Sequence, residues 1–339
     1  MNNVNLKQLA QQLGLAISTV SRALRDSHEI SQETKDRVQA LATKLGFQPN
    51  PHASSLRRNK SRTIAVIVPE IENNFFSQAI NGVELIAQEK GYHVLIYLTH
   101  ENTKLEKDFL HLLRNGRVDG LMISVSNTTT SFEHLEACRE AGLPFVFFDR
   151  VFEGFDVPNI TTDDVDISFK ATEHLIKRGC ERIAFLSLSE NLSISKRRGC
   201  GYKKALEKFQ LSDWQQMVEC SQDDEQNRVL IRKLLQQENP PDGIFAAVEK
   251  FAINTYQVCQ ELGIHIPGKL KVLSFSNLAA TALFHPPLTT IIQPAYDIGR
   301  EAATILFKII ENKKLLPSEN KVILPSQLIV RKSTAKGSL

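Results

Sequence analysis

The sequence predicts an α/β protein that carries a small all-α domain at its N-terminus. Three helical patterns follow one another over the first 46 residues. From residue 63 onwards, apolar runs of strand length alternate with amphipathic helical patterns, which is typical of parallel sheets covered on both faces. The alternation restarts after residues 161–163, so we expect two doubly wound halves.

The first two helical patterns predict a helix-turn-helix. Apolar residues recur at helical spacing over residues 6–13, and Gly14 is expected to end that helix because glycine accepts a left-handed C-cap. Ser18 is expected to cap the second helix. That helix would bury Val20, Ala23 and Leu24 and leave Thr19, Ser21, Arg22 and Arg25 largely exposed. Such a motif places its second helix in the major groove of DNA, whereas a plain αα-hairpin is the alternative.

A third helix completes a small core. Ser31 is expected to cap it and Gly46 to end it, so three helices form within about 45 residues. Ser31, at a helix N-terminus, is also well placed to contact a DNA phosphate. We call residues 1–62 the head. It holds ten basic and four acidic residues, a formal charge of +6 in a chain of net charge +3, so the remainder has −3. A basic head on a mildly acidic body indicates a polyanionic partner for the head.

A short hinge segment follows. Asn50 and Pro51 suit the N-cap and first position of a new helix of about seven residues. A helix of that length is marginal alone, so it needs a copy of itself or DNA as a partner. Ala53 and Leu56 would share one face, as in wedges that enter a DNA minor groove. A flexible basic linker is the alternative.

The body alternates strands and helices throughout. Predicted strands span residues 63–68, 93–98, 120–125, 144–148, 182–188, 243–248 and 271–275, and predicted helices span 75–91, 105–116, 133–141, 166–179, 196–209, 225–238, 251–263 and 295–312. Ligands in such sheets bind beyond the carboxyl ends of the strands, so a cleft between the two halves is expected.

Aromatic and polar residues gather at those strand ends and suit a sugar or another small polar metabolite. Phe75 or Phe76 could equally be a core residue, and Asp149 beside Arg150 could be a structural ion pair. The candidate ligand-binding residues are Phe75, Phe76, Asp149, Arg150, Arg198, Glu249, Ser276, Asn277 and Gln293.

Several classes of protein are disfavoured. No apolar run approaches the roughly 20 residues of a membrane span, and no secretory signal is visible. The five scattered cysteines form no CxxC pair and indicate reduced thiols in a cytoplasmic protein. Phosphate-loop, dinucleotide-binding, zinc-protease and nucleophile-elbow motifs are absent from the sequence, and its histidines have no metal-ligand spacing. We therefore expect neither an enzyme nor a cofactor or metal.

The segments LKQLAQQLGLAISTVSRAL, ISQETKDRVQALATKLGFQPNP and ASSLR closely resemble the LacI family of bacterial transcription regulators. VIVPEIENNFFSQAINGVELIAQEKGY, PFVFFDR, RRGCGYKKAL and HPPLTTIIQP match body segments of the family. The resemblance implies a DNA-binding domain at 1–48, a hinge helix and linker at 49–61, and a two-lobed, periplasmic-binding-protein-like body at 62–339. Lobe one would comprise 62–161 and 292–320, and lobe two 162–291 and 321–331.

The resemblance also implies roles for individual residues. Ile17, Ser18 and Arg22 would face bases, whereas Thr19, Ser21 and Ser31 would face phosphates. Ala53 and Leu56 would lie on the hinge helix, with Leu56 wedged into the central minor-groove step. The nine candidate ligand-binding residues would line an effector cleft.

The expected function is a homodimeric repressor that binds a pseudo-palindromic operator under the control of a small effector, most simply a carbohydrate. Two departures leave the effector unassigned. Val248-Glu249 stands where many sugar-responsive members have Asn-Asp, and Ser276 stands where they have a carboxylate. The tail after Val330 has no heptads, so a tetramerising coiled coil is not expected. A sugar receptor without a regulatory role and an enzyme with an appended DNA module are the competing classes.

Overall fold

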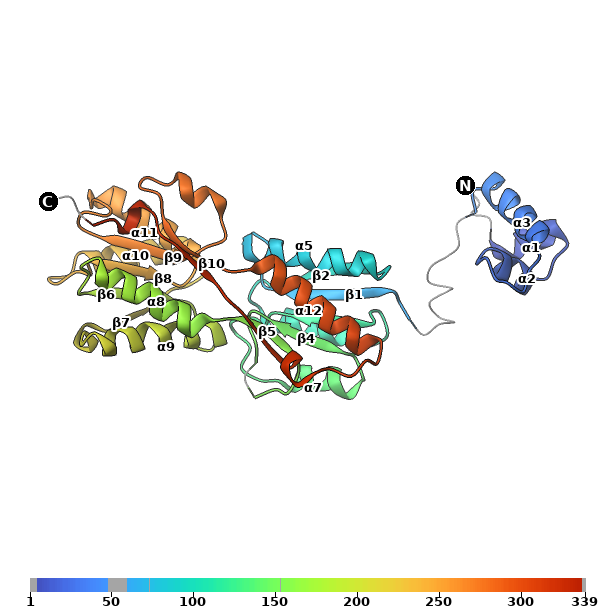
Figure 1. Cartoon of the computed structure of the whole chain (residues 1–339), viewed down its shortest axis with the longest axis horizontal. Coiled ribbons are helices and arrows are strands. Elements are labelled where there is room, and N and C mark those ends of the chain that lie inside the picture. The colour runs from blue at the N-terminus through green and yellow to red at the C-terminus, as the bar shows by residue number, and fades with distance from the viewer. Residues whose placement is uncertain (1–4, 48–59, 73, 153, 337–339) are drawn as a thin grey trace. The chain divides into compact units, whose positions relative to one another are not determined.

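The chain divides into two compact units, Met1–Ser61 and Arg62–Leu339. The computed structural model describes residues 5–47, 60–72, 74–152 and 154–336 (Figure 1). Each unit is built around its own apolar residues, the head around one cluster of helical residues and the body around the faces of two sheets.

The head contains α1 (Leu6–Leu13), α2 (Ile17–Ala23) and α3 (Gln32–Lys44). Their inner faces meet in one cluster, which consists of Leu9, Ala10, Val20, Ala23, Val38 and Ala42. This small core fixes α2 against the other two helices. The outer face of α2 is thereby held in a defined orientation within the head.

The caps of these helices agree only in part with the sequence prediction. Gly14 has the expected left-handed backbone, with φ of 65°, and Ser31 caps α3 by accepting the Thr34 amide. The expected Ser18 cap is wrong, because α2 already begins at Ile17 and its N-cap, Ala16, makes no side-chain bond. Ser18 is therefore a residue of the helix itself.

Lobe one of the body is a six-stranded parallel sheet in the order β11-β5-β4-β3-β1-β2. Helices α5 and α12 pack on one face of it, and α6 and α7 on the other. Its elements are β1 (Thr63–Val68), α5 (Asn74–Glu89), β2 (His93–Leu98), α6 (Thr103–Leu113), β3 (Gly120–Ile123), α7 (Glu133–Glu140), β4 (Phe145–Phe148), β5 (Asn159–Thr162), α12 (Ala295–Ile310) and β11 (Lys321–Leu324).

Lobe two repeats this plan in the order β12-β10-β9-β8-β6-β7. Helices α8 and α9 pack on one face, and α10 and α11 on the other. Its elements are α8 (Asp164–Lys177), β6 (Ile183–Ser187), α9 (Ser193–Lys208), β7 (Gln216–Glu219), α10 (Asp224–Leu235), β8 (Gly243–Ala246), α11 (Glu249–Leu262), β9 (Lys271–Phe275), β10 (Thr289–Ile292) and β12 (Gln327–Ile329). Short 3-10 helices span Ser212–Trp214, Ala279–Leu283, Pro317–Glu319 and Lys332–Thr334.

The two doubly wound halves are confirmed, with two differences at the sheet edges. Strand β12 pairs antiparallel with β10, so the second sheet is not wholly parallel. Strand β11 pairs with β5 in lobe one, whereas we expected residues 321–331 to belong to lobe two. Both strands are short and partly exposed, so they lack the continuous apolar run that marks a buried parallel strand.

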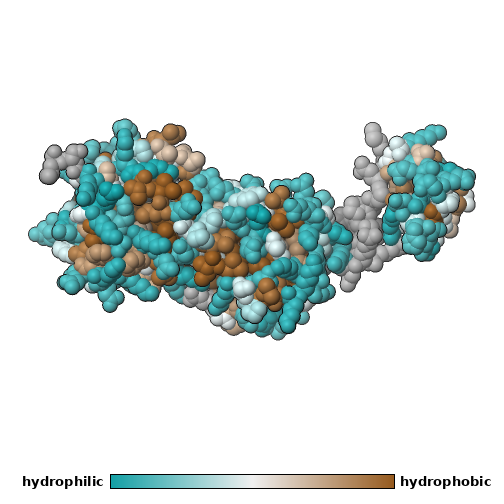
Figure 2. All heavy atoms as spheres, in the orientation of Figure 1, coloured by the Kyte–Doolittle hydropathy of each residue, from teal (hydrophilic) through white to brown (hydrophobic). Residues whose placement is uncertain are grey.

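The face seen in Figure 2 is hydrophilic over most of its area, with hydrophobic areas on the body. Among the exposed large hydrophobic residues of the body, Leu95 and Ile96 lie on edge strand β2, and Leu85 lies on α5. Within the described residues, no helix is both long enough and apolar enough to cross a bilayer.

Close helix packing in lobe two requires a glycine. A Cβ atom on Gly201 of α9 would lie 2.2 Å from the backbone oxygen of Val165 in α8. Real Cβ atoms do not approach backbone so closely, hence any larger residue here must push the two helices apart.

Gly201→Ala should therefore lower the free energy of unfolding by about 1–3 kcal/mol, as is typical of overpacking. Gly199→Ala, on the same helix, is the matched control, because the one tight contact of its Cβ would be with the flexible end of Met217 at 2.9 Å. Thermal and urea unfolding of the two variants measure the difference. Equal stabilities would contradict this account of the α8–α9 contact.

Candidate nucleic-acid interface and ligand cleft

The first turns of α2 present the side chains that were predicted to face DNA bases. Ile17, the first residue of the helix, is 43% exposed, and Ser18 and Arg22 are exposed as well. Ser18 and Arg22 are four residues apart and so lie on one helix face, beside Ile17. An arginine and a hydroxyl can bond to base edges, and Ile17 can contact a thymine methyl group.

The Arg22 guanidinium is held in place by a weak partner. Its Nη1 lies 2.9 Å from an Oε2 of Glu29, and both side chains are more than half exposed. Exposed ion pairs of this kind contribute at most about 1 kcal/mol, so base or phosphate oxygens can replace Glu29 at small cost.

The residues that were predicted to contact phosphates differ in how exposed their side chains are. Ser31 is exposed at the N-terminus of α3, and Thr19 is half-buried. Ser21 was expected to be largely exposed, but it is 8% exposed and its hydroxyl accepts a hydrogen bond from Arg25 at 2.8 Å. It lies between the core residues Val20 and Ala23 in the last turn of α2, at the edge of the face that packs on the core. Ala53 and Leu56 lie outside the described residues.

In the body, all nine candidate ligand-binding residues line one cavity between the lobes, which we call the central cavity. Its volume is only about 30 Å³, roughly that of one water molecule. Phe75 and Phe76 are both buried and serve as core residues as well as cavity walls. The full lining is Phe75, Phe76, Asp149, Arg150, Ile194, Arg198, Val248, Glu249, Phe275, Ser276, Asn277 and Gln293. Sequence reasoning missed its three apolar members, Ile194, Val248 and Phe275.

Arg198 is held on several sides in the wall of the central cavity. Its Nε donates to Asp164 Oδ1 at 2.8 Å, and its Nη1 donates to the Ala247 carbonyl at 2.7 Å. The guanidinium lies 3.7 Å from the centre of the Phe275 ring. Both Arg198 and Asp164 are at most 2% exposed, so this is a fully buried ion pair. It joins α9, α8 and the end of β8.

Arg150 forms a second buried ion pair, from lobe one. Its Nη1 donates to Glu101 Oε1 at 2.7 Å, and its guanidinium lies 5.7 Å from the centre of the Phe76 ring. The neighbouring Asp149 has a left-handed backbone with φ of 59° and lies 4.0 Å from Arg150 Nε. The Asp149–Arg150 ion pair, which was the alternative to a ligand-binding role, is therefore long, and the close partner of Arg150 is Glu101. Burial raises the pKa of Asp149, although Arg198 and Arg150 oppose the shift.

Hydrogen bonds close the central cavity across the lobes. The Asn277 amide of lobe two donates to Gln78 of α5 at 2.9 Å and to the Gln293 carbonyl at 2.7 Å. The Ser193 hydroxyl, at the start of α9, accepts the Val151 amide at 3.1 Å. Because these bonds join the two lobes, a ligand larger than a water molecule can enter the central cavity only if they break or shift.

A mouth cavity of about 290 Å³ adjoins the central cavity, and the two share Arg150, Val248 and Glu249. Charged residues dominate its lining. The Glu249 carboxylate accepts a hydrogen bond from Ser276 at 2.6 Å, and burial raises the pKa of both Glu249 and Glu70. The sequence analysis did not select Glu70, Asp224 or Lys250, although these three lie within a few residues of a strand end. It also missed Asn254, which lies further along α11, where the distance from a strand end gives no signal.

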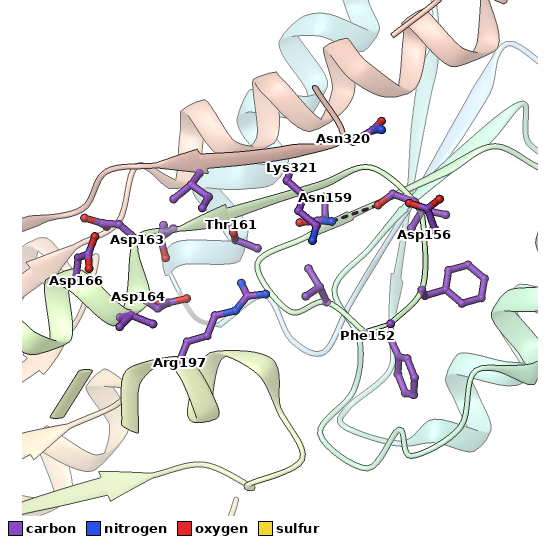
Figure 3. Close-up of a pocket in the computed structure, with 17 residues that line it drawn as sticks. Phe152, Asp156, Asn159, Thr161, Asp163, Asp164, Asp166, Arg197, Asn320 and Lys321 are labelled. Atoms are coloured by element: carbon purple, nitrogen blue, oxygen red, sulfur yellow. Dashed lines mark hydrogen bonds between the residues drawn. The ribbon is translucent and has the colours of Figure 1, made fainter. Parts of the chain in front are cut away.

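A larger cavity of about 730 Å³ lies beside the segments that link the lobes (Figure 3). Arg197 of α9 reaches into it from lobe two, opposite Asn159 and Thr161 of β5. Asp164 lines this cavity while its partner Arg198 lines the central one, so one ion pair separates the two spaces.

Two family models match the chain. Residues 5–50 match the model of bacterial regulatory proteins of the lacI family, and residues 61–331 match that of periplasmic binding proteins and the sugar binding domain of the LacI family. The chain is 30% identical over 330 residues to the HTH-type transcriptional repressor CytR of Escherichia coli (strain K12), covering 97% of this chain and 96% of that protein.

Solved structures share the fold. A lac repressor dimer bound to operator and the anti-inducer ONPF has a TM-score of 0.86 at 22% identity, covering 98% of this chain and all of that one. A LacI family regulator from Enterococcus faecium with bound ribose has a TM-score of 0.72 at 26% identity, covering 81% of this chain and all of that one. The architecture of head and two-lobed body is therefore that of known structures.

Asp164→Asn should destabilise the body by about 3–5 kcal/mol, because it leaves the buried Arg198 guanidinium without its counter-charge. Glu173→Gln, on the same helix, is the matched control. Among the described residues, Glu173 pairs with the exposed Lys177 and Lys208 alone, so its loss should cost less than about 1 kcal/mol. Urea unfolding distinguishes the two, and similar losses would show that the buried pair contributes no more than a surface pair.

Proposed function

Because this chain belongs to the LacI family of bacterial regulatory proteins, we propose that it is a homodimeric, cytoplasmic transcriptional repressor of one operator class, and not an enzyme. In this proposal α2 of each head reads one half of a pseudo-palindromic operator, since two-fold symmetry in the protein demands it in the DNA. The observation that supports it most directly is the exposed face of Ile17, Ser18 and Arg22 on a head of formal charge +6.

Base contacts are assigned to Ile17, Ser18 and Arg22, and phosphate contacts to Thr19 and Ser31. Ser21 is assigned a packing role, because its hydroxyl is occupied by Arg25. Ala53 and Leu56 keep the roles that the family resemblance implies, in which Leu56 wedges into the minor groove.

The body supplies the control. An effector that enters between the lobes must exchange the bonds of Asn277, Gln78 and Gln293 for bonds to itself. This exchange changes the arrangement of the two lobes. The head and the hinge segment lead directly into β1 of lobe one, so such a change can reach them. Allosteric coupling is typically about 1–3 kcal/mol and must be reciprocal, so operator DNA changes effector affinity by the same factor.

Arg22→Ala should reduce the preference of the full-length protein for a duplex selected from a random pool, with a loss of about 1–3 kcal/mol on that duplex for each bidentate base contact removed. Arg37→Ala is the control, because Arg37 is an exposed cation of α3 on the same head. Arg37→Ala should weaken binding to the selected duplex and to random duplexes by the same factor. Electrophoretic mobility shifts with both DNAs provide the measurement, and an unchanged preference in Arg22→Ala would contradict base reading by α2.

Leu56→Ala should weaken binding to the selected duplex at least about tenfold more than binding to random DNA, because a wedge acts only where the base step opens. Leu56→Met, which keeps the apolar bulk, should retain most of the affinity. The same titrations at several salt concentrations separate this loss from phosphate contacts. Equal losses on both DNAs would show that the segment serves only as a tether.

A further inference from the structure

The inner part of the ligand cleft carries more negative than positive charge. Two guanidinium groups, of Arg150 and Arg198, lie in it. Five carboxylates line the central cavity, pair with these two arginines or, in the case of Glu70, line the mouth cavity beside Arg150, so carboxylates outnumber the two arginines by three. The five are Glu70, Glu101, Asp149, Asp164 and Glu249.

The cations at the mouth do not remove this excess. Lys250 donates to the Gln222 carbonyl at 2.6 Å and lies 3.6 Å from Asp224. Arg228 pairs with Glu225 on its own helix. Lys250 and Arg228 therefore each already have an acidic partner outside the inner group of five carboxylates.

Glu70 and Glu249 face the mouth cavity with spare acceptor capacity. Glu70 is half-buried and has no hydrogen bond or ion pair within the described residues. Glu249 accepts a hydrogen bond from Ser276 through Oε2 and is also stabilised by the Leu278 backbone amide, which leaves further acceptor positions on its carboxylate. Burial of such carboxylates is costly unless a cation or proton compensates them. The raised pKa of each expresses that cost.

A third acceptor in the same wall lacks a donor. Asn254 of α11 is 2% exposed and lines the mouth cavity. Its Nδ2 donates to Asp224 at 3.1 Å, but its buried Oδ1 has no hydrogen-bond partner in the described residues. Buried polar atoms are rarely left unpaired, so this oxygen indicates a donor supplied from the cavity.

We propose that the effector is an amino sugar, whose protonated amine binds in the mouth cavity between Glu70 and Glu249 and whose hydroxyl groups donate to acceptors such as Asn254. This inference rests on the proposed function, since it names the effector of that cleft. A volume of about 290 Å³ approaches the roughly 300 Å³ at the lower end of small-molecule sites, so a single hexose ring suits it. Charge-assisted bonds from ammonium to carboxylate select the amine over a hydroxyl.

Isothermal titration of the full-length protein with matched sugars tests the proposal. The probes are glucosamine, galactosamine and mannosamine, each beside its neutral hexose and its N-acetyl derivative. At least one amine should bind about tenfold or more tightly than both neutral counterparts, as one charge-assisted bond predicts. If no amine binds, or if a neutral sugar binds as tightly as its amine, the proposal is wrong.

Two variants locate the contact. Glu70→Gln and Glu249→Gln should each reduce the preference for the amine at least about fivefold while the neutral sugars change little. Glu207→Gln, an exposed residue of α9, removes the same charge outside the cleft and should leave the preference unchanged. An equal loss of amine preference in all three variants would mean that the amine responds only to the net charge of the protein, and it would overturn the assignment.

Duplex selection with the same preparation keeps the two proposals apart. Sequence preference without any amine preference would reject the amino sugar and leave the repressor function intact. Amine binding by a protein that has no preference for any duplex would reject the repressor function instead.

Discussion

The buried Arg198–Asp164 pair is the contact on which the body most depends. It joins the first turn of α8 to α9 and, through the Ala247 carbonyl, to the end of β8. Burying an ion pair gains little over apolar packing, but removing either partner leaves a charge that the interior cannot solvate. The pair therefore fixes the position of the strand ends in lobe two, and with them one wall of the central cavity.

The same ion pair lies near the segments where the chain crosses between the lobes. Asp164 begins α8 directly after β5, the last strand of lobe one before the chain first crosses to lobe two. Gln293 stands at the return crossing and bonds to Thr162 at 3.2 Å. A ligand that contacts Arg198 or its neighbours thus acts close to both crossings. Small changes there can alter the relation of the lobes, because packed cores have discrete arrangements and do not deform continuously.

Much of the fold follows from the sequence because its elements are locally encoded. Strands β1, β2 and β9 begin and end where their apolar runs predict, and the helices differ by a few residues at their ends. Strands β5, β7, β10, β11 and β12 were not predicted. They have three or four residues each, and their identity as strands comes from pairing with neighbours distant in the chain.

The residues of the cleft could likewise be predicted in part from the sequence, while the contacts between them could not. The nine residues chosen at strand ends all line the central cavity, because parallel strands bring their carboxyl ends to one edge. Sequence spacing could not predict that Arg198 pairs with Asp164. Nor could it predict that Arg150 pairs closely with Glu101 and not with Asp149. The burial of Ser21 was missed for a related reason, since it depends on how α2 packs on the other two helices and on the position of the Arg25 side chain.

Selection of duplexes from a random pool by the wild-type, full-length protein tests the central claim most directly. The account predicts enrichment of one two-fold symmetric sequence, bound at least about 10³-fold more tightly than random DNA at physiological salt. Failure to enrich any sequence over random competitor, with affinity that depends only on salt, would contradict it.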